Sequence, residues 1–508
     1  MQCTPVAAER ATTSLCPPPL SLLPVELCQR LIPLLVGIAW LIRRYRGSRF
    51  SPRSSFDFEH ELSGLLRDMG RVIVEWVYNH AEPDSRDLLP TQIQIGNHWY
   101  QRCHAKTANR FVATLFGTIT LWRFAYRPIE ESLPCVFPLE ISLGLAAARA
   151  TPALADRVGQ HMAQCTQSAT LRILRRDHGL QWSVHLLRKV AATVAAEMNE
   201  HRQAAQATKL LGLLQKAQAS VGKHRPVLAV GRDGTFIPIR KGRRKHGPEY
   251  REASVGTVSV IDRAGDRLGS VYLGHMPEEG QPTLTSQLTK LITKVLEQWS
   301  GELPRLTYVT DGGSHQKQFF KKVLRKMRNP RSPGQRLKWE WVLDYFHACQ
   351  YITKLAEALF GDTREGHAWA AKMRHWLKHK PNGIYRVLHS AAALRDRRQL
   401  VGFAETYDKA YAYLRRRIRH LNYHGCRKRG LPIGSGVTEA CCKTMFTQRM
   451  KQSGMVWNVE SGQTVVDLRV IHLSGIWEPV REAYLQSKQH EAMRTQEQMN
   501  GIPARKAA

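Results

Sequence analysis

The sequence lacks any Cys-x-x-Cys pair. Its ten cysteines are scattered from Cys3 to Cys442 without the spacing of a disulfide framework or of a cysteine-based zinc site. Free, scattered cysteines are typical of proteins in a reducing compartment. We therefore predict a cytoplasmic protein without structural disulfides.

The sequence also lacks a long apolar run. The stretch LIPLLVGIAWLI (31–42) has twelve residues, whereas about 20 are needed to span a bilayer. The basic residues RRYR follow this run, whereas the positive charge of a secretory signal precedes it. We expect no stable membrane association, although a peripheral membrane helix remains possible. Residues 1–54 are treated as an extension of uncertain status, and a start codon placed too early explains them equally well.

Acidic residues are few. There are 42 Asp and Glu against 75 Lys and Arg, which gives a formal net charge of +33 and a pI near 10.1. Such a charge favours a polyanionic partner such as nucleic acid, but charge alone leaves open a ribosome-associated or membrane-surface protein. A chain of 508 residues is longer than a single compact hydrophobic core usually accommodates, so two or three domains are expected.

The first half of the chain changes from helix to strand and back to helix. Apolar residues recur at helical spacing over 55–80, and short β-type runs follow over 93–102 and 111–126. Three helical pieces separated by short polar breaks then occupy 151–214. Three helices suit a helix-turn-helix-like DNA-binding module, and a structural helical bundle is the equal alternative. The charge of the chain favours DNA contact, so 55–220 is predicted to be a DNA-binding region.

The central region has the pattern of a mixed sheet. Strand-like runs and amphipathic helices alternate here in the order of a ribonuclease H-like fold, with three strands as hairpins, then helix, strand, helix and strand. The predicted strands are 227–233, 252–262, 267–276, 306–311 and the start of 339–352, and the predicted helices are 283–299, 316–328 and the end of 339–352.

Three acidic residues occur at chemically informative positions. Asp233 and Asp311 each end an apolar strand-like run and are followed by glycine, and Glu439 lies in the first turn of a predicted helix. Taken singly, each has an ordinary explanation, since Asp-Gly is a turn signature and an early Glu complements a helix dipole. Together, three carboxylates in one pocket would repel one another unless divalent cations neutralise them. Two Mg²⁺ ions in such a pocket can stabilise both the attacking and the leaving oxygen when a phosphodiester bond is broken by displacement.

Several sequence blocks resemble the Mutator-like DDE transposases of bacterial insertion sequences, in particular the ISKra-type group. The likeness covers about residues 60–480 and depends on the order and spacing of the blocks. They read GRDGTFIP, YVTDGG, VLDYFHACQYI, LPIGSGVTEACCK and QRMKQSGMVW.

The resemblance implies a DNA transposase whose catalytic and metal-binding residues match Asp233, Asp311 and Glu439. It also implies a D-x-x-H element, Asp344 and His347, with a role in orienting DNA or supporting the acids, although His347 could equally be a packed histidine bonded to Asp344. The expected cofactors are two Mg²⁺ or Mn²⁺ ions. The expected partners are the terminal inverted repeats of the element, target DNA and further copies of the chain. The implied divisions are a core over 221–352, a helical insertion over 353–430, a closing helix over 431–480 and a tail over 481–508.

Basic clusters beside the predicted strands are candidate phosphate contacts, although some could be solvated helix faces. A nuclease or resolvase on the same core, without strand transfer, is the alternative enzyme, and an inactive transposase-derived DNA-binding protein is the non-enzymatic alternative. A nucleoid-associated bacterial protein is expected in each case. The candidate DNA-binding residues are Arg240, Lys241, Arg243, Arg244, Lys321, Lys322, Arg325 and Lys326.

Overall fold

The computed structural model describes residues 23–130, 132–242, 247–397 and 400–500. They divide into two compact units, one built mainly from residues up to Leu154 and the other mainly from Trp182–His490. Short pieces complete each: 173–181 and the C-terminal residues from 491 belong to the first unit, and 155–172 to the second. The third helix expected over 151–214 lies entirely in the second unit, with the central sheet. That 55–220 is a DNA-binding region stays a prediction.

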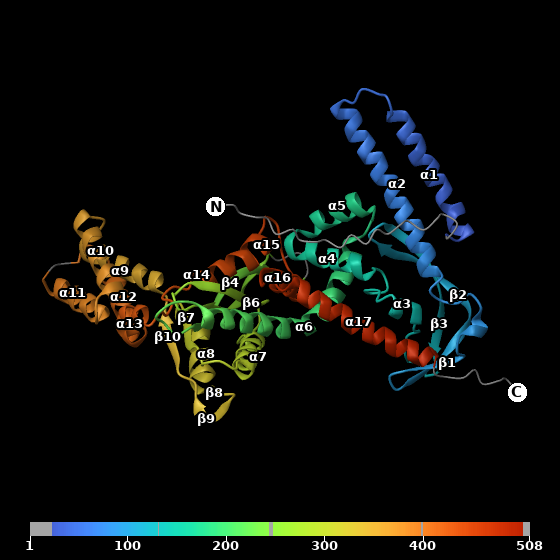
Figure 1. The fold of residues 1–508 in the computed structure, drawn as a ribbon. Helices are drawn as coiled ribbons and strands as arrows, with labels where there is room; N and C mark the ends of the chain where they lie inside the picture. Colours follow the sequence, from blue (N-terminus) through green and yellow to red (C-terminus); the bar gives the residue numbers. More distant parts are fainter. Residues whose placement is uncertain (1–22, 131, 243–246, 398–399, 501–508) are drawn as a thin grey trace, which may run out of the picture. The chain divides into compact units, whose positions relative to one another are not determined.

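The first unit joins a helical hairpin to a three-stranded antiparallel sheet (Figure 1). Helix α2 packs on strand β3, and Asn79 at the end of α2 bonds to the strand backbone through Thr120 and Trp122. The elements are α1 (Val25–Tyr45), α2 (Pro52–Asn79), β1 (Gln92–Ile95), β2 (His98–Thr114), β3 (Gly117–Pro128) and α3 (Pro138–Ser142).

Helix α1 is longer than the apolar run within it. It has 21 residues, and its most apolar stretch of 18 residues has a mean hydropathy of 1.7. By length and composition the helix could cross a membrane, so the expectation that this segment is too short is wrong. The helix begins at Val25, before the apolar run, because the polar residues Glu26, Gln29 and Arg30 are also good helix formers. A signal sequence near an N-terminus meets the same criteria. Within the hairpin, α1 and α2 pack through Leu27, Leu31 and Val72 and are joined by the Arg30–Glu75 ion pair.

A five-stranded mixed sheet forms the centre of the second unit, with strand order β10-β7-β4-β5-β6. Strands β4, β5 and β6 are antiparallel neighbours, and β7 and β10 run parallel to β4. This order and the predicted hairpins make the architecture compatible with a ribonuclease H-like fold. The strands are β4 (Val227–Ile239), β5 (Glu249–Ile261), β6 (Arg267–His275), β7 (Arg305–Thr310) and β10 (Trp339–Leu343), and a separate two-stranded hairpin is formed by β8 (Arg328–Asn329) and β9 (Ser332–Arg336).

One face of the sheet is covered by α6 (Val184–Ala219), α7 (Pro282–Gln298) and α8 (Ser314–Lys322). The apolar stripe predicted for 283–299 is buried, and Leu288 of α7 lies against Gly256 of β5. The helix predicted over 316–328 is shorter than expected. After α8 the chain forms a 3₁₀ turn at Leu324–Lys326 and enters the β8–β9 hairpin, because Leu324 is buried against the sheet.

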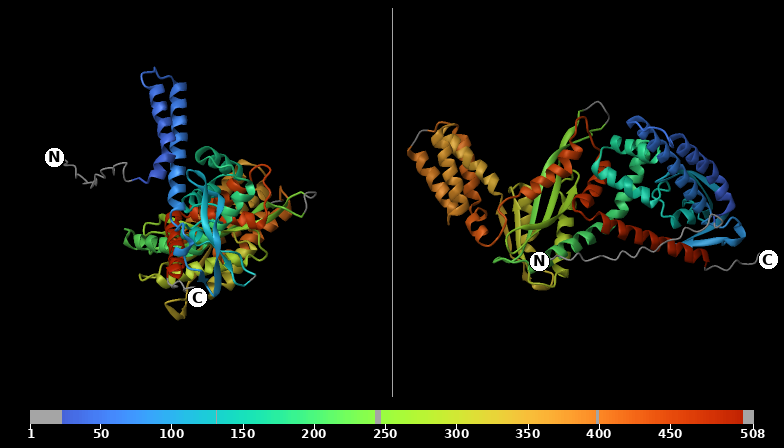
Figure 2. Two further views of the ribbon diagram at one scale, coloured as in Figure 1. Left: turned by 90° about the vertical axis from the view of Figure 1, so that its right-hand side faces the viewer. Right: turned by 45° about the horizontal axis from the view of Figure 1, so that its top comes forward.

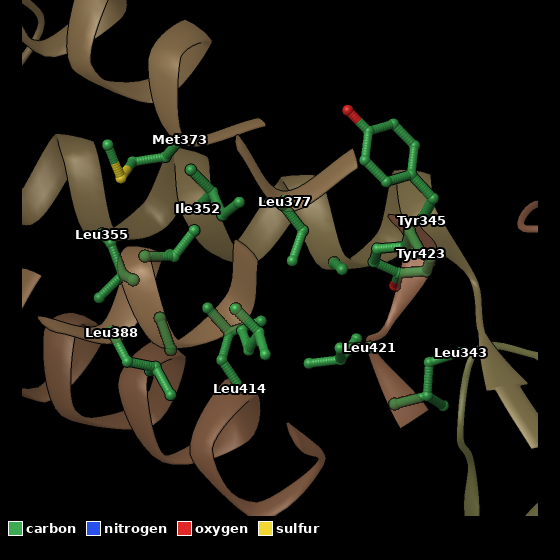
Figure 3. Packing of buried hydrophobic residues seen from close by; sticks show 14 of the residues in the cluster. Leu343, Tyr345, Ile352, Leu355, Met373, Leu377, Leu388, Leu414, Leu421 and Tyr423 are labelled. Atoms are coloured by element: carbon green, nitrogen blue, oxygen red, sulfur yellow. The ribbon is translucent and has the colours of Figure 1, made fainter. Parts of the chain in front are cut away.

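The remaining helices of the second unit form a bundle and a closing layer. A shared apolar core joins the bundle to the β4, β7 and β10 side of the sheet. Figure 3 shows Leu343 of β10 near Leu421 and, within the bundle, Tyr345 next to Tyr423. The right-hand view of Figure 2 shows this bundle, in orange, at one end of the sheet. The bundle consists of α9 (Tyr345–Phe360), α10 (Arg364–His379), α11 (Gly383–Arg397), α12 (Ala404–Arg416) and α13 (Tyr423–Lys428).

The closing layer begins with the helix that carries Glu439. The helical path from 436 to 450 contains one turn of π-helix, a feature often found at functional sites. The elements are α14 (Gly436–Cys442), the π-helical segment Lys443–Thr447, α15 (Gln448–Met450), α16 (Val459–Leu473) and α17 (Trp477–Asn500), and α4 (Pro152–Gln164) and α5 (Gln167–His178) precede α6.

Candidate active site

Asp233 on β4 and Asp311, the residue directly after β7, are at equivalent positions along two neighbouring parallel strands. Strands β4 and β7 pair with Gly231 opposite Val309, and each aspartate lies two residues beyond that pair. Side chains two residues apart on a strand share a face, and adjacent strands are about 4.8 Å apart. Asp233 is not at the end of its strand as predicted. Strand β4 continues to Ile239, because β5 pairs with it over its whole length.

The face on which Asp233 lies is fixed by its neighbours. The preceding Arg232 points to the opposite face, where it donates to Gln281 and Thr285 of α7. Asp233 therefore faces α14, and its Oδ2 accepts a hydrogen bond from Cys442 Sγ at 3.3 Å.

Helix α14 approaches β4 very closely. A Cβ at Gly231 would lie 1.9 Å from Thr438 Oγ1, so only glycine fits at this crossing. Thr438 also bonds across to Thr257 of β5 through their hydroxyls, 2.8 Å apart. This packing brings the first turn of α14, which includes Glu439, over the same face as Asp233.

Asp311 is held by the turn that follows it. Gly312 adopts a φ of +84°, a conformation that side chains disfavour, and a Cβ there would lie 2.6 Å from Leu343. Asp311 Oδ1 accepts from the Gly313 amide at 3.2 Å, and Tyr413 Oη donates to the Asp311 carbonyl at 3.0 Å.

The charges of Asp311 and Glu439 affect the pKa of Asp233. The pKa of Asp233 is raised, chiefly by burial, and the negative charges of Asp311 and Glu439 raise it further. Hydrogen bonds from the Gly234 amide and Cys442 act in the opposite direction. Burial likewise raises the pKa of the Cys442 thiol, so this group stays protonated and can donate to Asp233.

Glu439 is exposed, and one carboxylate oxygen is tied to the protein. Its Oε1 accepts from Ser435 Oγ at 2.8 Å. Across the described residues, no group of three or more His, Cys, Asp or Glu side chains is gathered closely enough to hold a metal ion. The three acids thus share one face of the sheet, without forming a ready-made ligand shell.

Asp344 lies deeper than the other acids, with 1% of its surface exposed. It immediately follows β10, and its amide donates to Thr310 O beside Asp311. Its Oδ1 accepts from the His347 amide at 2.6 Å, and its Oδ2 accepts from the amide and hydroxyl of Ser435 at 2.6 and 2.9 Å. Asp344 therefore caps α9 and anchors the segment that leads into α14.

His347 does not bond to Asp344 through its ring. The imidazole packs edge-on against Tyr351 and Tyr413, with ring centroids 5.3 and 5.7 Å away. Since Tyr413 bonds to the Asp311 backbone, His347 supports that strand end through an aromatic contact. Its role in orienting DNA stays a prediction.

Three residues at the site were missed from the sequence. The Ser435 hydroxyl lies within hydrogen-bond distance of two carboxylates, those of Asp344 and Glu439. Cys442 donates to Asp233, and Tyr413 donates to the Asp311 carbonyl from a helix with no sequence signal for such a role. The Gly-Ser-Gly turn before α14 was the single available hint.

The candidate DNA-binding residues are spread over several elements. Arg240 and Lys241 follow β4, and Lys321 and Lys322 end α8. Arg325 and Lys326 lie on the following 3₁₀ turn, and all six side chains are exposed. Arg243 and Arg244 lie outside the described residues.

Comparisons with known proteins give little further information. No protein-family model and no curated protein sequence matches the chain. Among solved structures, the Drosophila P element transposase strand transfer complex is similar at 10% sequence identity, over 66% of this chain and 83% of that one. The TM-score is 0.22, which is too low to support an argument about fold or function.

Proposed function

We propose that this protein is a metal-dependent DNA transposase of the DDE type, which cuts the ends of a bacterial insertion sequence and joins them to target DNA. The observation that carries the proposal is the level position of Asp233 and Asp311 on one sheet face, with Glu439 on the helix that crosses the same face. The net charge of +33 and the resemblance of the sequence blocks support it.

The donor chemistry of the site suits hard divalent cations. Asp233, Asp311 and Glu439 offer only carboxylate oxygens, which are the ligands that Mg²⁺ and Mn²⁺ prefer. Burial is the main cause of the raised pKa of Asp233, and a cation would offset both this cost and the added repulsion from Asp311 and Glu439. Two such ions, if bound to these carboxylates, would stabilise the negative charge that develops on the phosphodiester during the reaction. We expect ligand binding to draw the exposed Glu439 toward the two aspartates.

The reaction has two displacements. In the first, a water oxygen bonds to phosphorus and the bond to the 3′ oxygen breaks, which leaves a 3′-hydroxyl and a 5′-phosphate. In the second, that 3′ oxygen bonds to a target phosphorus and loses its proton to solvent, while the target's own 3′ oxygen leaves and takes up a proton to become a hydroxyl. The protein's part is to position both strands and to balance their negative charge with basic residues.

A supercoiled-plasmid assay tests this function. Purified protein, labelled DNA carrying the ends of the element, and target plasmid are incubated with Mg²⁺, Mn²⁺ or a chelator. A transposase gives labelled ends covalently joined to the plasmid, and only when a divalent ion is present. Cleavage without joining would instead establish the nuclease or resolvase alternative. Binding without cleavage would leave the inactive DNA-binding alternative.

Ser435→Ala is expected to weaken catalysis more than folding. A hydroxyl has one proton, so Ser435 can donate to Asp344 or to Glu439 but not to both at once. Removing it releases Glu439 from its anchor, and misplacement of such a group costs up to about 100-fold in rate. Asp344 keeps both amide donors, so the loss of stability should be about 1–3 kcal/mol.

The measurement is the rate of strand transfer against Mg²⁺ concentration, with thermal unfolding in parallel. Ser435→Thr keeps the hydroxyl and should retain most of the activity. Equal rates for Ser435→Ala and the parent would show that the serine does not position Glu439.

A further inference from the structure

A polar cavity lies away from the three acids, none of which lines it. It has a volume of about 220 Å³ and is bounded by the end of β4, the start of α5 and the segment around Trp457. The Arg240 amide donates to Trp457 O at 2.9 Å, which closes one wall. Arg240 is seven residues beyond Asp233 on an extended chain, or about 23 Å at roughly 3.3 Å per residue.

The cavity is lined by three arginines. Arg188 and Arg240 are exposed at its rim, and Arg449 is 1% exposed. The Arg188 guanidinium is oriented by two hydrogen bonds to Gln167 Oε1, at 2.9 and 3.2 Å. No aspartate or glutamate is found among the described residues that line it.

Arg449 has unused hydrogen-bond donors. Its Nη2 donates to Met162 O at 3.3 Å, but Nε and Nη1 are buried and have no hydrogen-bond partner among the described residues. Burial and the nearby charge of Arg469 lower the pKa of Arg449 to about 10, so it remains cationic at neutral pH. The Arg449 guanidinium also lies 5.6 Å from the centre of the Trp457 ring, which contributes a cation–π contact. Burying Nε and Nη1 without an acceptor is still costly.

A helix N-terminus adds to this positive field. Helix α5 has twelve residues and begins at the cavity, with Thr166 and Gln167 among the lining residues. Thr166 Oγ1 already accepts from the Ala169 amide, whereas the first amides of a helix have no partner within it. Free amides and the helix dipole favour an anion at this position.

We propose that this cavity is a phosphate-binding site, in which Arg188, Arg240 and Arg449 and the first amides of α5 bind the phosphate oxygens. Guanidinium groups suit phosphate because their donors match its oxygens in pairs. The volume also leaves room for bridging water, since a water molecule occupies about 30 Å³. The phosphate belongs either to a nucleic-acid backbone or to a free phosphorylated molecule.

The site does not depend on the acids being catalytic. Only the possibility that the phosphate belongs to a DNA backbone rests on the proposed function, because it requires DNA as the substrate. Asp233→Asn should leave phosphate binding unchanged, so a failure of either proposal is distinguishable from a failure of the other.

The test uses the full chain and two exposed residues whose loss should not affect folding. Arg188→Gln/Arg240→Gln is compared with Arg364→Gln, which removes an exposed arginine at the start of α10. Inorganic phosphate is titrated by calorimetry, and a short DNA duplex by fluorescence anisotropy at several salt concentrations. We expect the double variant to bind phosphate at least about tenfold more weakly. If the backbone is the source, the slope of log affinity for the duplex against log salt should also fall by about one to two.

The outcomes separate the sources. Weaker binding of both probes supports the backbone phosphate, and so does weaker binding of the duplex alone. Weaker binding of inorganic phosphate with unchanged duplex affinity supports a free phosphorylated ligand. A double variant that matches Arg364→Gln with both probes overturns the site.

Discussion

Asp233→Asn is expected to abolish DNA cleavage and strand transfer, with a loss of about 10³-fold or more. The substitution keeps the size of the side chain and the acceptor for the Gly234 amide, but removes a negative charge that the proposed metal site needs. Its effect on folding should have the opposite sign. Burial and the charges of Asp311 and Glu439 disfavour the Asp233 carboxylate, so an uncharged amide should leave the metal-free protein equally or more stable.

The measurement combines the plasmid assay with thermal unfolding, both with and without Mg²⁺. Added Mg²⁺ should raise the unfolding temperature of the parent protein and have less effect on the variant. Asp266→Asn is the matched control, since Asp266 is exposed in the turn between β5 and β6. Full activity in Asp233→Asn would remove the carboxylate site from the mechanism.

Arg202→Met is expected to destabilise the second unit by about 3–5 kcal/mol at neutral pH. Arg202 of α6 and Asp467 of α16 form an ion pair at 3.0 Å, with only 6% and 15% of their side chains exposed. Gln463 is the other side chain that donates to Asp467 Oδ1. Without Arg202, the Asp467 carboxylate would be buried and poorly compensated.

The loss of folding stability caused by Arg202→Met should depend on pH. Burial already raises the pKa of Asp467, whereas Arg202 lowers it, as does the more remote charge of His275. Removing Arg202 therefore raises this pKa further. A carboxyl group whose pKa is higher in the folded than in the unfolded state contributes stability at pH values below its unfolded-state pKa. This contribution is lost as the pH rises through the folded-state pKa. The variant should thus be closest to the parent in acid and furthest from it at neutral pH.

Denaturant unfolding followed by circular dichroism, repeated across pH, provides the measurement. Arg202→Met/Asp467→Leu should recover much of the lost stability and lose the pH dependence, because no buried charge remains. If Arg202→Met were as stable as the parent at all pH values, the pair would have no structural importance.

Local sequence patterns were sufficient for most of the central sheet. The apolar runs that end near Asp233 and Asp311 are strands, and the stripe over 283–299 is helix α7, because each pattern matches the period of its element. Glu439 lies in a first helical turn, as predicted. Errors occurred where pairing is non-local. Strand β4 continues beyond Asp233 because β5 pairs with it, and α8 ends early where β8 and β9 pair.

The sequence by itself determined the order of strands and helices and the residue types available for chemistry, since hydrophobic period and turn residues act locally. Only the tertiary structure decided which side chains meet. The register of β4 and β7 aligns Asp233 with Asp311, and the crossing of α14 at Gly231 adds Glu439. The Ser435 hydroxyl meets Asp344, which is 91 residues earlier in the chain, and Arg449 Nε and Nη1 are buried without an acceptor among the described residues. Such contacts depend on packing and burial, which have no local pattern.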